Sequence, residues 1–203
     1  MDIFLVFLFS YVSGSIPFGL LLTKIFRNQD IRKIGSGNIG ATNVLRTGNK
    51  FLAAVTLVLD ILKGYLPVII TIRYFPDLIY LSCLITFLGH IFPAWLNFKG
   101  GKGVATYLGI LFALSLELGL LFIFTWVVVT LIFRYSSISS MFASLTIFIT
   151  MLIKETALQS INSKDDLGEG LILILFIFFI LIIFTHRKNV SNLKNNTEEK
   201  IKI

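Results

Sequence analysis

A glycine-rich polar loop between two apolar stretches is the first place in the chain that could do chemistry. Residues 35–46 read GSGNIGATNVLR. Its three glycines let the backbone turn tightly and approach a ligand closely, and turned N–H groups beside a helix start favour an anion. Arg46 adds a planar fork that matches phosphate. The loop predicts phosphate binding by Gly37, Asn38, Gly40, Thr42, Asn43 and Arg46, with Ser36 as a candidate catalytic residue.

The same loop contains a literal GxGxxG, and Asp60 lies twenty residues past Gly40. A dinucleotide site needs a strand before the glycines and a βαβ unit around them. Here an apolar stretch and a charged segment precede the loop, and Asp60 itself lies in an apolar stretch, so we reject that reading. A flexible linker is the remaining alternative, although plain linkers seldom carry so many side-chain donors in close order.

A second polar stretch places glycines around a lysine. Residues 89–93 read GHIFP, and residues 98–106 read FKGGKGVAT. The resemblance to a Walker loop is superficial, because Gly103 follows Lys102 where Ser or Thr is required, and nucleotide hydrolysis is therefore unsupported. A glycine cradle around a lysine still favours phosphate. We expect Lys102 to act in catalysis and Gly100, Gly101 and Gly103 to bind phosphate.

His90 lies at the end of an apolar stretch, just before Pro93. It is either a satisfied histidine at the membrane interface or, beside Lys102, a phosphate ligand or proton carrier, and hence a candidate catalytic residue. The second histidine, His186, is ninety-six residues away, and no acids or cysteines cluster near either one. A metal site is therefore not expected.

A third polar region is divided between two places. Residues 134–140 read RYSSISS, and residues 186–189 read HRKN. A structural role explains both segments as well as a functional one does. The serines can cap a helix, and the basic cluster can contact anionic lipid. In the functional reading, Ser140, His186 and Asn189 join the expected phosphate-binding residues.

Asp60 and Lys63 are charged residues inside an apolar stretch. Charges within a membrane span are costly and mark function by default. At i and i+3 of a helix the two side chains share a face and can pair. We expect an intramembrane pair that supports the site, with a purely structural pair as the alternative.

These polar segments need a scaffold embedded in lipid. The 203 residues are 56% hydrophobic and only 14% charged, whereas soluble domains are about 25% charged. The single cysteine, Cys83, lies in an apolar run, so neither a disulfide nor a cysteine metal cluster is expected. A bilayer core of about 30 Å needs roughly 20 apolar residues as helix. The apolar stretches cover residues 3–25, 51–72, 78–96, 103–133, 138–153 and 167–185.

The placement of charge predicts the topology, because basic loops face the cytoplasm. The net charge is +7, and the Lys and Arg residues concentrate in residues 24–50, at Lys99 and Lys102, at Arg134 and in the tail. The other connections hold the acids Asp77, Glu155, Asp165, Asp166 and Glu169.

All the basic loops lie on one side if residues 103–133 form a helical hairpin that bends near Glu117 and Gly119. We therefore expect an all-α integral membrane protein, a bundle of about seven transmembrane helices, some short, with the N-terminus outside and the C-terminus cytoplasmic. Residues 1–188 would form one transmembrane domain, followed by a polar cytoplasmic tail of residues 189–203.

The polar segments resemble the signatures of the bacterial acyl-phosphate:glycerol-3-phosphate acyltransferases, the PlsY family. The resemblance is carried by residues 36–46, by residues 89–90 with 98–106, and by His186-Arg187 with Asn189, and the length and span pattern are similar as well. The tail departs from the family, because this chain has Asn192 and Asn196 where the family usually has Arg and Gly.

The resemblance implies transfer of a fatty acyl group from acyl-phosphate to the 1-hydroxyl of glycerol 3-phosphate, which gives lysophosphatidate and inorganic phosphate. It places a cytoplasm-facing site in the bacterial plasma (inner) membrane and implies that acyl-CoA is not the donor. The soluble-headed acyltransferases have His followed five positions later by Asp, and here those positions are Trp95 and Ser191. Expected partners are both substrates, membrane lipids and the upstream enzyme that forms acyl-phosphate; no cofactor and no nucleic acid is expected.

The proton of the attacking hydroxyl has two candidate acceptors. His90 could take it directly, or a substrate phosphate oxygen could, which the family suggests and which we favour. The rival function is a transporter of small organophosphates, but a carrier needs polar groups reachable from both sides and here they gather on one. A non-catalytic lipid-binding scaffold leaves the two glycine loops unexplained.

Overall fold

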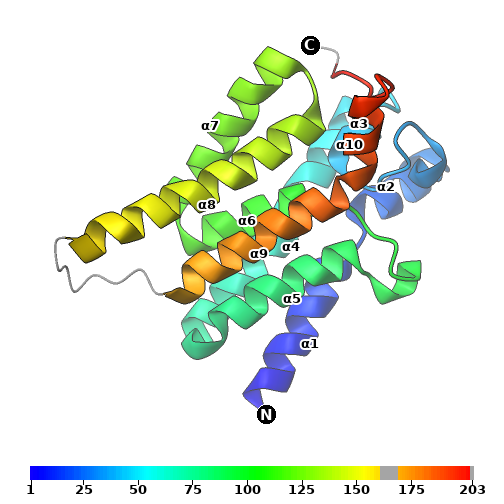
Figure 1. The fold of residues 1–203 in the computed structure, drawn as a ribbon. Coiled ribbons are helices and arrows are strands. Elements are labelled where there is room, and N and C mark those ends of the chain that lie inside the picture. The colour runs from blue at the N-terminus through cyan, green and yellow to red at the C-terminus, as the bar shows by residue number, and fades with distance from the viewer. Residues whose placement is uncertain (161–168, 202–203) are drawn as a thin grey trace. The chain divides into compact units, whose positions relative to one another are not determined.

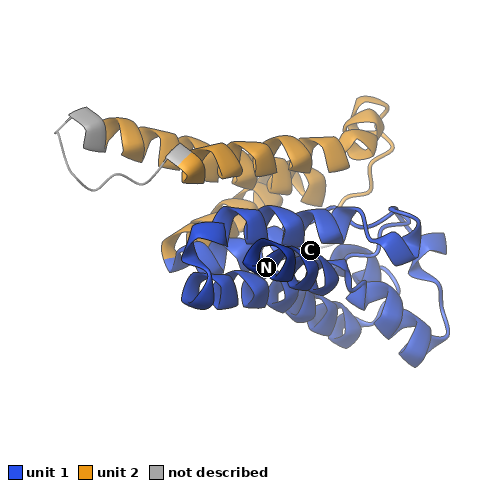
Figure 2. Ribbon diagram, turned by 90° about the horizontal axis from the view of Figure 1, so that it is seen from below, with its two compact units in different colours: residues 1–116 blue, residues 117–203 orange. Residues whose placement is uncertain are grey.

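The computed structural model describes residues 1–160 and 169–201, and every regular element in these ranges is helical (Figure 1). Asp165 and Asp166, which the topology argument uses, lie outside the described residues, as do the last two residues of the tail. The chain forms two compact units, residues 1–116 and residues 117–203, which Figure 2 colours separately. The expected division into one domain of residues 1–188 and a tail stays a prediction.

The first unit contains six α-helices and three short 3-10 turns. In chain order they are α1 (Asp2–Ser15), α2 (Phe18–Arg27), η1 (Ile31–Lys33), α3 (Ala41–Leu45), α4 (Lys50–Tyr74), η2 (Pro76–Leu78), α5 (Ile79–Ile91), η3 (Ala94–Leu96) and α6 (Val104–Leu114). The second unit is built from α7 (Leu116–Phe133), α8 (Ser136–Ser160), α9 (Glu169–Thr185) and α10 (Arg187–Lys194).

Four described helical segments are long and apolar enough to cross a membrane, namely Lys50–Tyr74, Pro76–Leu96, Leu116–Phe133 and Ser136–Ala157. Two bent pairs bring the total to six, if α1 with α2 and α9 with α10 each count as one span. The remaining apolar helix, α6, is too short to cross alone, because a bilayer core of about 30 Å needs roughly 20 residues. The membrane-embedded helical fold is as predicted, and the orientation of its termini stays a prediction.

The stretch 103–133 is two helices, as predicted, but the break lies at Ser115. Ser115 is extended at φ −163° and ψ 131°, and its N–H closes α6 on the Leu111 carbonyl. The predicted bend near Glu117 and Gly119 is misplaced by a few residues. Glu117 instead stands in the first turn of α7, where its carboxylate complements the positive end of the helix dipole.

Glycines bring the helices of the first unit into close contact. The most extensive pairings are α4 with α6 and α1 with α5. A Cβ at Gly64 would clash with the Thr106 carbonyl and one at Gly109 with the Ile61 carbonyl, so α4 and α6 meet backbone to backbone. Small residues at helix contacts are typical of membrane bundles, where packing has to replace the hydrophobic effect. This contact fixes the start of α6, and therefore the second glycine loop, against the charged middle of α4.

The tail folds back within the second unit. The Ile201 N–H donates to the Arg134 carbonyl at 2.7 Å, and Glu198 accepts hydrogen bonds from Ser137, Asn189 and Asn192. One carboxylate thus ties the polar tail to the start of α8.

Candidate active site

The first glycine loop is organised around the buried side chain of Asn43, which is 2% exposed. Its amide nitrogen faces the carbonyls of Ile31, Ile34 and Asn38 at 3.1, 2.9 and 2.8 Å, and its oxygen accepts from the Ser36 N–H at 3.0 Å. Both ends of the side chain are therefore occupied by the loop itself. Asn43 holds the loop in shape, and direct phosphate binding by it stays a prediction.

The other candidate residues of this loop are more open to solvent. Ser36, Gly37, Thr42 and Arg46 are exposed, and Asn38 and Gly40 are half-buried. Gly35 has φ +51°, and a Cβ there would lie 2.5 Å from Asn43 Oδ1 and 2.8 Å from Arg46 Cδ. The glycine is therefore required for Arg46 to run along the loop.

An exposed ion pair precedes this loop. Arg32 donates to Asp30 through Nε at 2.9 Å and through Nη2 at 2.7 Å. These side-chain hydrogen bonds hold the pKa of the Asp30 carboxyl well below its usual range. The Arg32 guanidinium is thereby engaged by a carboxylate, whereas Arg46 lies within the glycine loop.

The second glycine loop is folded around His90, which is 4% exposed. Gly100 and Gly101 donate backbone hydrogen bonds to the carbonyls of Ile91 and His90, both at 3.1 Å. The imidazole Nδ1 lies 3.1 Å from Thr106 Oγ1, and a Cβ on Gly101 would clash with Nε2. The histidine thus fills the space under the loop and links it to α6.

Lys102 lies between two buried glycines and is itself half-buried. Gly103 takes φ +84°, a conformation that favours glycine, and a Cβ there would clash with the Phe87 ring. The backbone therefore turns sharply at Gly103 into α6, and Lys102 is the one cationic side chain within residues 100–103.

One hydrophobic cluster joins the two loops. Ile39 and Val44 of the first loop are buried in it, and Leu96, just before the second loop, packs against it. The remaining buried members are Leu20, Ile31, Leu52 and Ala53. The sequence predicted two separate phosphate-binding loops, and this packing brings their supports together within the first unit.

The predicted intramembrane pair also forms. Lys63 Nζ lies 2.7 Å from Asp60 Oδ1, and both side chains are 3% exposed. The same ammonium donates to the Ile16 carbonyl at 2.6 Å and lies 5.6 Å from the centre of the Phe18 ring. Ile16 is in the break between α1 and α2, where the axes bend by 41°. Lys63 therefore connects the ion pair in α4 to a carbonyl at the break between α1 and α2.

Two aromatic residues near the second loop were not singled out from the sequence. Trp95 donates from Nε1 to the Ser15 carbonyl at 2.8 Å. The Tyr11 hydroxyl donates to the Phe92 carbonyl at 2.8 Å and accepts from the Ala94 N–H at 2.9 Å. The available signal was their type, since Trp and Tyr concentrate at membrane interfaces. Together they tie the approach to the second loop onto α1.

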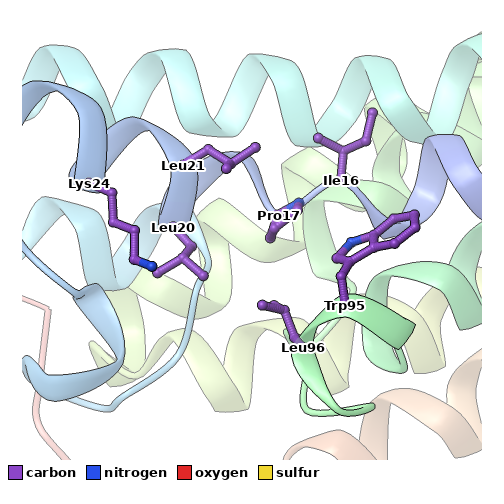
Figure 3. Close-up of a pocket in the computed structure, with 7 residues that line it drawn as sticks. All are labelled: Ile16, Pro17, Leu20, Leu21, Lys24, Trp95 and Leu96. Carbon is purple, nitrogen blue, oxygen red and sulfur yellow. The ribbon is translucent and has the colours of Figure 1, made fainter.

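An apolar pocket of about 430 Å³ lies beside the break (Figure 3). Its lining comes from the break, from α2 and from η3. The residues are Ile16, Pro17, Leu20, Leu21, Lys24, Trp95 and Leu96. Nothing in the sequence pattern indicates this pocket, because its walls come from segments about eighty residues apart.

The three remaining candidates belong to the second unit. His186 is buried, with Nδ1 at 2.8 Å from the Ile182 carbonyl, and Asn189 donates to Glu198. Ser140 donates to the Ser136 carbonyl at 2.8 Å and accepts from Trp126 Nε1 at 3.2 Å. These contacts support the helices and the tail. Phosphate binding by Ser140, His186 and Asn189 stays a prediction.

The fold and the two loops define a helical membrane protein with cationic, glycine-rich loops that can hold anions. The family model described as glycerol-3-phosphate acyltransferase matches residues 4–196. The chain belongs to the glycerol-3-phosphate acyltransferase family, and it is an integral membrane acyltransferase of the PlsY type.

Individual relatives agree with this assignment. The chain is 52% identical to the glycerol-3-phosphate acyltransferase of Pelagibacter ubique (strain HTCC1062) over 203 residues, which is 100% of both chains. It is 47% identical to that of Brucella anthropi over 194 residues, covering 95% of this chain and 90% of the relative.

Two solved structures are also similar over the whole chain. The glycerol 3-phosphate form of PlsY (YgiH), an integral membrane glycerol 3-phosphate acyltransferase, gives a TM-score of 0.89 at 32% identity and covers 100% of this chain and 96% of that one. The lysophosphatidic acid form gives a TM-score of 0.86 at 31% identity with the same coverage.

Proposed function

We propose that the protein transfers a fatty acyl group from acyl-phosphate to the 1-hydroxyl of glycerol 3-phosphate, forming lysophosphatidate and inorganic phosphate for phospholipid synthesis. The observation that carries this proposal is the shared cluster of Ile39, Val44 and Leu96. It brings together the bases of two glycine loops, each with a cation, Arg46 or Lys102, next to an apolar pocket. Such a combination suits substrates that are anionic at one end and, in one case, apolar at the other.

The reaction needs positioning more than it needs a strong nucleophile. The hydroxyl oxygen attacks the acyl carbonyl carbon, an ester bond forms, and the bond from that carbon to the phosphate oxygen breaks. Because the donor is an activated anhydride, orienting the hydroxyl against it supplies much of the acceleration. Lys102, Arg46 and the backbone N–H groups of both loops stabilise the charge on the carbonyl oxygen and on the departing phosphate. Ser36 donates to a phosphate oxygen from the exposed side of the first loop.

The hydroxyl proton passes to a phosphate oxygen of the substrate. His90 is the alternative acceptor, but its Nδ1 lies against Thr106 and its Nε2 against Gly101, and the ring is 4% exposed. A general base has to reach the proton within hydrogen-bond distance. Its surroundings support a role for His90 in positioning the second loop.

The test is a two-donor assay with the purified protein in lipid and no other enzyme present. Labelled glycerol 3-phosphate is mixed with palmitoyl-phosphate or with palmitoyl-CoA, and lysophosphatidate is measured. We expect product with palmitoyl-phosphate and none with palmitoyl-CoA. Equal rates with both donors would contradict the donor assignment, and no product from either would contradict the activity.

We also propose the plasma (inner) membrane of a bacterium as the location, with the glycine loops facing the cytoplasm, where soluble glycerol 3-phosphate is available. The one-sided placement of the basic loops supports this orientation. Because acyl-phosphate is both reactive and apolar, contact with the enzyme that forms it would shorten its path. Co-purification of the two enzymes from crosslinked membranes tests that partner.

A further inference from the structure

The hydroxyl of Tyr11 in α1 bonds to both sides of the turn that follows α5. It donates to the Phe92 carbonyl at 2.8 Å and accepts from the Ala94 N–H at 2.9 Å. Phe92 caps the C-terminus of α5, and Ala94 begins η3, with Pro93 between them. Carbonyls at the end of a helix and N–H groups at the start of one lack partners within their own helix. One side chain from a distant part of the sequence therefore satisfies both groups.

The segment that begins at this turn is closed on itself by backbone hydrogen bonds. The Pro93 carbonyl accepts from the N–H groups of Leu96 and Phe98, both at 3.0 Å. The N–H groups of Gly100 and Gly101 return to the last two carbonyls of α5, both at 3.1 Å. A shift of the first turn would therefore be carried to these two glycines and to the lysine that follows them.

Two consecutive residues of this segment are in a left-handed conformation. Asn97 has φ +52° and Phe98 has φ +59°. This conformation is uncommon for residues other than glycine, and it is disfavoured for a bulky side chain. It persists only where the surrounding structure holds it. The shape of the second glycine loop therefore depends on the contacts that fix it from outside.

A second hydrogen bond attaches the loop to the same face of α1. Trp95 donates from Nε1 to the carbonyl of Ser15, which lies four residues, or about one helical turn, after Tyr11. The rings of Tyr11 and Trp95 lie 6.4 Å apart. A Cβ on Gly89 would lie 2.7 Å from the Tyr11 carbonyl, so α1 and α5 are in close contact just before the loop. Two attachment points fix the orientation of the loop as well as its distance from α1.

We propose that Tyr11 is a positioning residue for acyl transfer: its hydroxyl fixes the orientation of the second glycine loop, and through the loop backbone it fixes the place of Lys102. Placement matters because a misplacement of about 1 Å can lower a rate about a hundredfold. The role of Lys102 at the substrate phosphate rests on the proposed function, whereas the effect of Tyr11 on the loop does not. The motion of the loop can therefore be tested without turnover.

Motion of the loop is measured with a spin label. In the Cys83→Ala background, a nitroxide at Lys99→Cys reports on the loop, and one at Lys33→Cys reports on the exposed segment before the first glycine loop. Tyr11→Phe removes the hydroxyl and keeps the ring. We expect Tyr11→Phe to narrow the electron paramagnetic resonance lines of the label at position 99, because the loop moves more, and to leave those at position 33 unchanged. Unchanged lines at position 99, or equal narrowing at both positions, would overturn the proposal.

The effect on the reaction is measured at saturating acyl donor with glycerol 3-phosphate varied. Tyr11→Phe should lower kcat/KM about tenfold, which is the effect expected for the loss of one or two hydrogen bonds. Tyr74→Phe is the matched control, because it removes the hydroxyl of an exposed tyrosine at the end of α4. This control should change kcat/KM by less than about twofold.

A double variant shows whether Tyr11 acts through Lys102. If the hydroxyl works by placing the ammonium, Tyr11→Phe should lower kcat/KM no further in the Lys102→Ala background, because the group that it places is gone. A tyrosine that only stabilises the fold would lower the activity by the same factor in both backgrounds. Additive losses would therefore overturn the positioning role.

The two readouts separate this proposal from the proposed function. If the wild-type protein makes no lysophosphatidate from acyl-phosphate, the proposed function fails, and the spin label still decides whether Tyr11 holds the loop. If the label at position 99 becomes more mobile while Tyr11→Phe and Tyr74→Phe have equal kcat/KM, Tyr11 holds the loop without positioning Lys102, and the proposal fails.

Discussion

The ammonium of Lys63 donates a 2.6 Å hydrogen bond to the carbonyl oxygen of Ile16, from the middle of α4 to the break between α1 and α2. The same ammonium is 2.7 Å from Asp60. One cation therefore neutralises a buried carboxylate and donates to a carbonyl at the break, whose other hydrogen bond comes from the Phe18 N–H two residues on. The charges that mark α4 in the sequence therefore also hold the break between α1 and α2, which lines the pocket.

Removing Lys63 should destabilise the protein strongly. Lys63→Met leaves Asp60 charged and buried without its partner, which typically costs about 3–5 kcal/mol. The double variant Asp60→Leu/Lys63→Met removes the charge as well and should recover most of that loss. It still removes one of the donors to the Ile16 carbonyl, which keeps the hydrogen bond from the Phe18 N–H at 3.1 Å, and this residual cost should be about 0.5–1.5 kcal/mol.

SDS-driven unfolding from mixed micelles measures these differences. Arg73→Met is the matched control, because Arg73 is an exposed cation at the end of the same helix, and it should stay close to wild type. A single Lys63→Met variant as stable as the Arg73→Met control would show that the pair does not hold the break.

The Asn43 side chain should be irreplaceable by a carboxylate. Asn43→Asp keeps the acceptor for the Ser36 N–H but turns a donor that faces three carbonyls into an acceptor. We expect a clear fall in melting temperature, because a buried charge would face three carbonyl oxygens.

Asn38→Asp is the comparison in the same loop. The Asn38 oxygen accepts from the Ile39 N–H at 2.8 Å, which an aspartate can still do. Its melting temperature should stay near wild type. Equal losses in the two variants would mean that loop charge, and not the Asn43 hydrogen bonds, sets stability.

Gly101 should tolerate no side chain, because a Cβ would clash with the buried His90 ring. Overpacking of this kind typically costs about 1–3 kcal/mol, so Gly101→Ala should lower the melting temperature. At Gly40 the nearest atom to an added Cβ is 4.0 Å away, and Gly40→Ala should melt close to wild type. Equal melting temperatures for Gly101→Ala and Gly40→Ala would contradict the close packing of His90 under the loop.

Much of the scaffold could be predicted from the sequence because the signals are local. Runs of apolar residues predict spans, and i,i+3 spacing brings Asp60 and Lys63 together. The position of the break at Ser115 was harder to predict. Glu117 in an apolar run suggests that a helix is interrupted there, whereas an acid in the first turn of a helix favours its start. Length alone does not say where an apolar run breaks.

The contacts that define the site are long-range, and this explains what the sequence did not show. The residue type of Asn43 predicts phosphate binding, and it does not show that the amide donates to three carbonyls of its own loop. The residue type of His90 predicts a proton carrier, and it does not show that the ring packs against Gly101. Trp95 reaches Ser15, eighty residues away. A single sequence gives residue types but not the partners that decide between positioning and catalysis.

The topology can be tested with single cysteines. Cys83 is buried, so Cys83→Ala provides a cysteine-free background. In spheroplasts, Lys33→Cys and Lys194→Cys should resist a membrane-impermeant maleimide until the membrane is opened, whereas Asp77→Cys should react at once. Labelling of Lys33→Cys and Lys194→Cys from opposite sides would mean that residues 103–133 cross the membrane once.

The positive charge on Lys102 should be needed for activity. Lys102 is flanked by glycines that leave little lateral space, since Gly101 abuts His90 and Gly103 abuts Phe87. Hydrogen bonds to charged groups contribute about 1.5–3 kcal/mol, so Lys102→Ala should lower kcat/KM about ten- to a hundredfold or more. Expression and melting temperature should persist.

Two further variants separate a phosphate site from a general membrane charge. Lys102→Arg should restore little activity, because a planar guanidinium has to fit a loop made narrow by glycines. Lys50, an exposed cation at the start of α4, lies outside both glycine loops. Lys50→Ala should leave kcat/KM unchanged. The other Lys and Arg residues of segment 24–50 still supply the positive charge that orients the protein in the membrane. Steady-state assays with both substrates varied measure the difference, and comparable losses from Lys102→Ala and Lys50→Ala would assign the effect to diffuse membrane electrostatics.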